Sequence, residues 1–360
     1  LELHGFQKLP DERPHPVFMV NMNAPCTLML NIEAIMKEPF SSNPCVKAAI
    51  ARTRKKLQAA LSRLYPGNLV LTLDMKMIHE ILIQKICDEN GVPTVPTVPR
   101  KLGPAMCVPF GNILYRYIVP NTVTKSLHTE KYYMPDTKSF TIKSFPYYLS
   151  LGNQMKMLKS FNRPVILVDD LLHKGYRIKA LDPLLNHAKI NVEKIFVGIL
   201  SGRGKELMDI QKRKVDGAYF IPRLKAWFNE DILYPFIGGD ALWRGKYPER
   251  NLLPSINLVL PYAAPSFIKG ASNRTIYHLS QTCIENSIEI LTALEKEYLA
   301  LHGRTLTLAR LGEVFIAPRC PDQGQNMDYD IKQSPSFYLQ NDLEKLIRIE
   351  DSVSHSGSII

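Results

Sequence analysis

The sequence predicts an α/β protein with a mainly parallel sheet of about five strands flanked by helices, and with helical extensions at both ends. Two observations carry this prediction. Short apolar runs rich in branched residues are typical of strands buried on both faces of a parallel sheet, and here they alternate with segments of helical periodicity. The strands expected on this basis are 69–73, 106–110, 165–168, 194–200 and 215–221.

Residues 1 to about 64 are interpreted as a mainly helical N-terminal extension. A helix is expected over 27–36, and a second begins where Ser42 or Asn43 precedes Pro44, a favourable helix start. The second helix also carries four cations. These could form a nucleic-acid patch, but a solvated helix face is the commoner meaning of such charges. The cations are Arg52, Arg54, Lys55 and Lys56.

The α/β pattern begins after a turn near 65–68. Asp74 is expected to cap a helix that runs to about Asn90 and ends at Gly91. The core of the pattern extends to about residue 245. A mainly helical C-terminal region follows over 246–360, with helices expected at 274–302, 306–315 and 341–349.

The most informative stretch follows the apolar run 165–168. Asp169 and Asp170 come next and are expected to open a loop that leads through four residues to Gly175, where a helix begins. In this geometry backbone N–H groups and the positive end of a helix can collect a phosphate. Loops at the carboxyl ends of parallel strands are also where such folds place their functional residues.

This strand, acid pair and glycine resemble the signature of type I phosphoribosyltransferases and their non-catalytic relatives, which are built around 5-phosphoribosyl 1-pyrophosphate. The resemblance implies that Asp169 and Asp170 hold the ribose hydroxyls. It also implies that they act on Mg²⁺ indirectly, through those hydroxyls or water. The loop from His173 to Arg177 would wrap the 5′-phosphate, so its binding residues would be Lys174, Gly175, Tyr176 and Arg177.

The loop departs from the family pattern in its cations. Lys174 and Arg177 stand where the family usually has threonines. They could bind phosphate electrostatically, or the loop could have lost its usual ligand. His173 stands where purine-using members carry an aspartate that assists at the base nitrogen. Histidine can take such a role because it titrates near neutrality.

Further positions follow from the resemblance by their order along the chain. The loop after the first core strand touches pyrophosphate in the family, and here it is expected at 73–76 with Lys76 as its cation. The segment 120–133 lies where the family has a mobile loop that closes over the reacting centre. His128 and Lys131 would then contact an anion, although an exposed hairpin with incidental charges fits equally well.

Two later segments could complete the site. Arg203 lies in a glycine-containing loop at the end of a strand, where it could face the ligand or simply form a tight turn into the next helix. Trp227 or Phe228 would stack on the base, since stacking needs a large flat apolar surface. Either aromatic could equally belong to the core.

Charge and cysteine usage set the class of partner and the compartment. The net charge of +11 favours phosphorylated small molecules, nucleic acid or an acidic neighbouring domain, and there is no recognised RNA-binding signature. Six scattered cysteines without a paired motif suggest a cytoplasmic protein with free thiols. No stretch is apolar enough to predict a membrane span. Because the sequence opens at Leu1, we expect neighbouring domains in a longer polypeptide.

Two functions from different classes follow. The first is an enzyme that transfers a ribosyl group to or from a nitrogen base, with Mg²⁺ as cofactor and with His173, Asp169 and Asp170 as its catalytic residues. The second is a non-catalytic module that binds a phosphorylated ribose or nucleotide. A homodimer is a further expectation. Nucleic-acid binding through the basic surface is the less favoured third hypothesis.

Overall fold

The computed structural model describes residues 21–248, 252–263, 268–322 and 329–356. The chain forms two compact units. Unit 1 comprises Leu1–Thr72, Tyr133–Asp136 and Ala226–Ile360, and unit 2 comprises Leu73–Tyr132 and Thr137–Lys225. The expected N-terminal extension, whose first 20 residues lie outside the described part, therefore shares a unit with the expected C-terminal region.

Unit 2 is built on a five-stranded sheet in which every neighbouring pair of strands is parallel. This confirms the predicted α/β fold with a mainly parallel sheet. In spatial order the strands are β4 (Val123–Thr124), β3 (Met106–Pro109), β7 (Val165–Leu172), β8 (Val192–Ser201) and β9 (Val215–Ile221).

Helices flank this sheet and supply its apolar cover. They are α3 (Met75–Glu89), α4 (Leu151–Ser160), α5 (Tyr176–His187) and α6 (Gly202–Ile210). Two further strands, β5 (Thr129–Tyr133) and β6 (Phe140–Ser144), are neighbours in a separate sheet. Asp74 caps α3 as predicted, because its carboxylate accepts a hydrogen bond of 2.7 Å from the backbone N–H of Lys76. One core cluster joins apolar side chains of β3, β7 and β8 to residues of α4 and α5.

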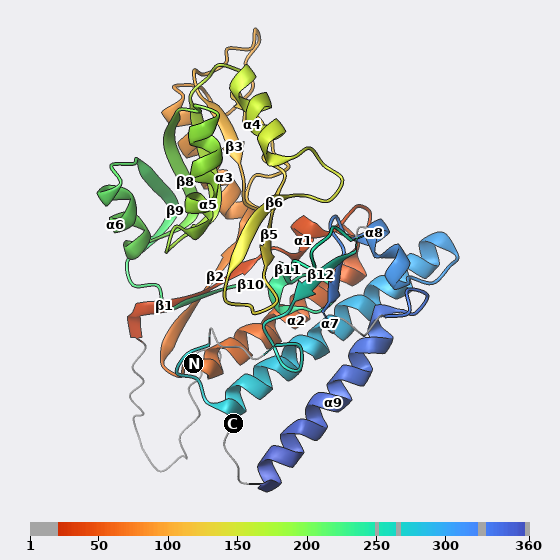
Figure 1. The fold of residues 1–360 in the computed structure, drawn as a ribbon. Helices are drawn as coiled ribbons and strands as arrows, with labels where there is room; N and C mark the ends of the chain where they lie inside the picture. Colours follow the sequence, from red (N-terminus) through yellow and green to blue (C-terminus); the bar gives the residue numbers. More distant parts are fainter. Residues whose placement is uncertain (1–20, 249–251, 264–267, 323–328, 357–360) are drawn as a thin grey trace. The chain divides into compact units, whose positions relative to one another are not determined.

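Unit 1 centres on three long helices, α2 (Pro44–Leu64), α7 (Asn273–His302) and α9 (Pro335–Ser356), with α2 packed on α7 and α7 on α9 (Figure 1). Asn43 caps α2 by accepting hydrogen bonds of 2.8 and 3.1 Å from the next backbone N–H groups. The short helices α1 (Ile32–Ile35) and α8 (Leu311–Val314) complete the helical part. The packing of α2 on α7 explains why the two ends of the sequence share one unit.

The strands of unit 1 correct two expectations. The predicted helix over 27–36 is wrong, because β1 (Asn21–Leu30) is a strand and only the single turn α1 follows it. Pairing with β10 (Ala226–Asn229) buries Thr27, Leu28 and Met29, a long-range contact that local periodicity does not show. The strand expected at 69–73 is β2 (Asn68–Asp74), but it belongs to the sheet β10-β1-β2 rather than to the sheet of β7.

Three further short strands lie in unit 1. They are β11 (Asp240–Leu242), β12 (Leu253–Ile256) and β13 (Arg319–Pro321), with β11 antiparallel and β13 parallel to β12.

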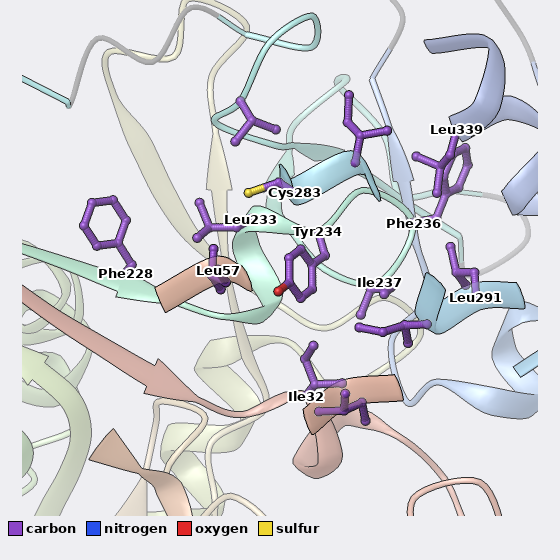
Figure 2. Packing of buried hydrophobic residues seen from close by; sticks show 14 of the residues in the cluster. Ile32, Leu57, Phe228, Leu233, Tyr234, Phe236, Ile237, Cys283, Leu291 and Leu339 are labelled. Atoms are coloured by element: carbon purple, nitrogen blue, oxygen red, sulfur yellow. The ribbon is translucent and has the colours of Figure 1, made fainter. Parts of the chain in front are cut away.

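The core of unit 1 is a continuous apolar cluster drawn from distant parts of the sequence. Figure 2 shows Leu57 of α2, Leu291 of α7 and Leu339 of α9 in this cluster together with Tyr234 and Phe236. No helix in the described part of the chain is long and apolar enough to cross a membrane.

Candidate functional site

The acid pair lies inside a strand of unit 2 and not in the loop after it. β7 continues through Asp169 and Asp170 to Leu172, because the neighbouring strand β8 runs on to Ser201 and pairs with it along this length. Both acids are buried, with 1% and 8% of their surface exposed. The expected start of the loop at Asp169 is therefore wrong by four residues.

Arg177, in the first turn of α5, turns its side chain back onto these acids. Its Nη1 lies 2.6 Å from Asp169 Oδ1 and 3.3 Å from Asp170 Oδ2, and its Nη2 donates a hydrogen bond of 2.7 Å to the carbonyl of Phe110. A further hydrogen bond of 2.7 Å runs from the backbone N–H of Ile113 to Asp170 Oδ1. The two carboxylates thus already bind the Arg177 guanidinium, and Asp170 also binds the backbone of the loop that contains Ile113.

That loop follows β3, the strand next to β7, and it contains a glycine that the sequence analysis missed. A Cβ at Gly111 would lie 2.6 Å from Oδ1 of both Asp169 and Asp170, so only glycine lets the backbone pass this close. The loop after the first core strand therefore lies at 110–113 rather than at 73–76. The sequence does contain a signal for this loop, because Gly111 closely follows the buried strand β3. The order of strands in the sheet was needed to recognise it.

The pKa of Asp169, the more deeply buried of the two acids, is changed mainly by burial. Burial raises the pKa of Asp169 to about 6, with Arg177 opposing the rise and Asp170 adding to it. A magnesium ion does not fit the acid pair in this arrangement, because Arg177 already occupies it. Within the described ranges, no group of three or more His, Cys, Asp or Glu residues could hold a metal ion. The Mg²⁺ cofactor that the resemblance implies stays a prediction, which a ligand titration with and without Mg²⁺ can check.

The expected phosphate loop lies at the carboxyl end of β7. Gly175 has a φ of 67°, a conformation that favours glycine, and a Cβ there would lie 2.5 Å from the Leu207 side chain. Helix α5 begins at the next residue, Tyr176, whose side chain is exposed. Lys174 is exposed as well, and its ammonium lies 5.9 Å from the centre of the Tyr176 ring.

His173 links this loop to Ser201, where β8 passes directly into α6. Its Nδ1 lies 2.8 Å from Ser201 Oγ, which donates to the Leu172 carbonyl at 3.1 Å and accepts from the backbone N–H of Gly204 at 3.0 Å. Because the serine hydrogen is used on Leu172, Nδ1 of His173 is the donor to Ser201, and Nε2 carries the lone pair. Burial lowers the pKa of His173, and the charges of Arg203 and Lys174 lower it further. The structure thus brings His173, Lys174 and Arg203 together.

The other predicted site residues in unit 2 lie elsewhere. Lys76 is in the first turn of α3, after β2. His128 packs among aromatic rings, with Tyr115 Oη hydrogen-bonded to its Nδ1 and the Tyr148 ring 3.9 Å away, and burial lowers its pKa. Lys131 places its ammonium 5.7 Å from the centre of the Phe140 ring.

The two aromatics expected at a base belong to unit 1. Trp227 and Phe228 lie on β10, which pairs with β1. Trp227 is 42% exposed, whereas Phe228 is 1% exposed and part of the core of unit 1. Of the two roles left open for Phe228, the structure places it in the core.

Comparison with known proteins gives little beyond this geometry. No family model matches the chain, and no curated protein matches it. An adenine phosphoribosyltransferase from Thermoanaerobacter pseudethanolicus is 14% identical over 49% of this chain and 86% of its own, with a TM-score of 0.23. The AQ2163 protein from Aquifex aeolicus is 15% identical over 52% and 85%, with a TM-score of 0.26. At these scores neither likeness defines the fold or the function of this chain.

Proposed function

We propose that unit 2 binds a phosphorylated ribose or nucleotide-like ligand at the carboxyl ends of β7 and β8, as a binding module rather than as a transferase. The contact between Arg177 and the acid pair carries this proposal. In the family that the motif resembles, the acids hold the ribose hydroxyls of the donor. Here they hold an internal cation, so the part of the site that would orient a ribose for transfer is already taken.

The neighbouring groups favour an anion. Lys174 lies in the loop after β7 and Arg203 in the first turn of α6, yet both act on the pKa of His173. The N-terminus of α5 lies at the same loop, and helix N-termini favour phosphate through their backbone N–H groups. A phosphate bound here would contact Lys174 after β7 and Arg203 after β8. It would not have to contact Asp169 or Asp170.

Ribosyl transfer to or from a nitrogen base is the second candidate function, because one observation favours it. Ser201 fixes the tautomer of His173 so that Nε2 can accept a proton. A general base with this arrangement would assist a nitrogen nucleophile. The two candidates differ in whether pyrophosphate is released and whether Mg²⁺ is required.

Calorimetric titration of 5-phosphoribosyl 1-pyrophosphate, ribose 5-phosphate and inorganic phosphate, each with and without Mg²⁺, tests the proposal. We expect binding that does not require Mg²⁺ and releases no pyrophosphate. The double variant Lys174→Ala/Arg203→Ala should weaken binding by about a hundredfold or more, because each lost charged hydrogen bond is worth about 1.5–3 kcal/mol.

The matched control is Lys101→Ala/Lys156→Ala, which removes two exposed lysines of unit 2 that lie away from the residues following β7 and β8. It should leave the affinity for these small ligands unchanged. Absence of binding by all three compounds would contradict the proposal. Pyrophosphate release in the presence of a base would establish the transferase instead.

A further inference from the structure

The net positive charge of the protein lies in one unit. Unit 2 holds 24 lysines and arginines against 12 aspartates and glutamates, a net charge of +12, whereas the rest of the chain holds 21 against 22. The proposed phosphate site uses few of these cations. The excess therefore points to a second anionic partner of unit 2.

Many of the remaining cations gather at the amino-terminal edge of the sheet, opposite the proposed site. Strands β7, β8 and β9 are parallel neighbours, so the turns that lead into them from α4, α5 and α6 lie in a row. With about 4.8 Å between strands, the row spans about 10 Å. We call its cations the basic edge: Lys159, Arg163, Lys189, Lys212, Arg213 and Lys214.

The surface between these turns is hollowed. A hollow of about 220 Å³ is lined by Lys159, Arg163 and Lys189, and another of about 440 Å³ by Lys212, Arg213 and Lys214. Between them, a hollow of about 340 Å³ is lined by Asn186, Gln211 and Arg213 among others. Asp182 pairs with Arg213 at 2.9 Å, whereas Lys189, Lys212 and Lys214 are exposed. The cations thus form a continuous strip with space for a chain of anionic groups.

Two of the exposed lysines occupy strained backbone positions. Lys189 and Lys212 have φ values of 51° and 54°, in the left-handed region that usually holds glycine after a helix. A non-glycine residue there costs about 1 kcal/mol. Folding alone would therefore favour glycine at both turns. Their lysines fit a role in binding.

An exposed aromatic lies within the same strip. Phe161 is 42% exposed and belongs to the turn between α4 and β7, flanked by Lys159 and Arg163. Cations that follow a backbone, combined with an aromatic ring on which a base can stack, are the two features that bind single-stranded nucleic acid. An acidic protein partner would not need the ring. A lipid surface would need a broader apolar patch.

We propose that the basic edge binds single-stranded nucleic acid, with its phosphates on the exposed lysines and one base stacked on Phe161. This inference is independent of the proposed function, because it concerns the opposite edge of the sheet and other residues.

Fluorescence anisotropy with labelled oligouridylate and oligothymidylate of about 20 nucleotides tests it. The variant Lys189→Glu/Lys212→Glu/Lys214→Glu should lower the affinity at least about tenfold, and the slope of log affinity against log salt should become shallower by about 2, since each phosphate contact contributes about 0.7. Phe161→Ala should lower the affinity about tenfold without changing that slope. Binding of both oligonucleotides would identify phosphate and base as sufficient, and a preference for one of them would add a contact to the 2′-hydroxyl or to the 5-methyl group of the base.

The matched control is Lys47→Glu/Lys55→Glu/Lys296→Glu, which changes the net charge equally but at exposed lysines of unit 1. It should change the affinity far less. The variant Lys189→Ala/Lys212→Ala/Lys214→Ala should change the salt slope in the same direction. That result would show that the loss in the glutamate variant is not caused by misfolding. Lys174→Ala/Arg203→Ala should retain oligonucleotide binding, which separates this test from that of the phosphate site. Equal losses in the two glutamate triples, or equally tight binding of polyglutamate or duplex DNA, would overturn the proposal.

Discussion

Replacing Arg177 by alanine is expected to destabilise unit 2 by about 3–5 kcal/mol at pH 8, the usual cost of removing one partner of a buried ion pair. The guanidinium neutralises Asp169 and Asp170 and also holds the Phe110 carbonyl, so its loss leaves two buried carboxylates without their cation. Urea denaturation followed by far-UV circular dichroism measures the change. Both tryptophans of the chain, Trp227 and Trp243, lie in unit 1, so tryptophan fluorescence reports that unit separately in the same experiment.

The cost should depend on pH in a defined direction. The folded-state pKa of Asp169 is raised from 3.8 to about 6, so the stability linked to its protonation is fully present below about pH 4 and lost as the pH rises through 6. A protonated Asp169 no longer needs a cation. Arg177→Ala should therefore cost less at pH 5 than at pH 8.

Lys179→Ala is the matched control, because Lys179 is exposed on the same helix. It should change the free energy of unfolding by no more than about 0.5 kcal/mol. An Arg177→Ala protein as stable as this control at pH 8 would show that the ion pair does not form in solution.

Replacing Arg54 by alanine is expected to have a similar effect on unit 1, about 3–5 kcal/mol. Glu230 is fully buried, and Arg54 binds it through Nε at 2.7 Å and Nη2 at 2.9 Å while also pairing with Glu33. Burial raises the pKa of Glu230, and Arg54 opposes that rise. Tryptophan fluorescence during urea denaturation measures the loss directly, since it reports unit 1.

The neighbouring Lys55 provides the control, because it is exposed on the same helix and Lys55→Ala should be nearly neutral. Arg54→Ala/Glu230→Gln should recover part of the stability, since the buried charge is gone. Glu230 accepts hydrogen bonds of 3.2 and 3.3 Å from the backbone N–H groups of Asn31 and Ile32, and the glutamine keeps an oxygen that can accept them. A double variant no more stable than Arg54→Ala would contradict a cost that comes from the unpaired charge.

Local patterns in the sequence were sufficient for much of the fold of unit 2. The strands β7, β8 and β9 and the cap Asp74 depend on neighbouring residues, as does the cap Asn43 in unit 1, and the structure confirms them. β1 could not be predicted in this way. Its partner β10 lies 200 positions away in the register that pairs Cys26 with Ala226, and no local periodicity contains that information.

Side-chain partners show the same limit. The sequence placed Arg54 among four cations on a helix face, but its partner Glu230 is 176 positions away. Arg177 is only eight positions from Asp169, yet whether its guanidinium faces a ligand or the acids depends on how α5 packs on the sheet. Trp227 and Phe228 follow β9 closely in sequence, but the chain enters unit 1 at Ala226.

The passage of the chain from β2 through unit 2 to β10 leads us to expect an order of folding. β2 and β10 belong to the same sheet but are separated by roughly 150 residues, and closing a long flexible loop costs conformational entropy. A chain of that length has a radius of gyration of about 40 Å when unfolded and about 15 Å when folded. Folding of unit 2 would shorten the distance between β2 and β10, so we expect unit 2 to fold first and the sheet of unit 1 to be completed last.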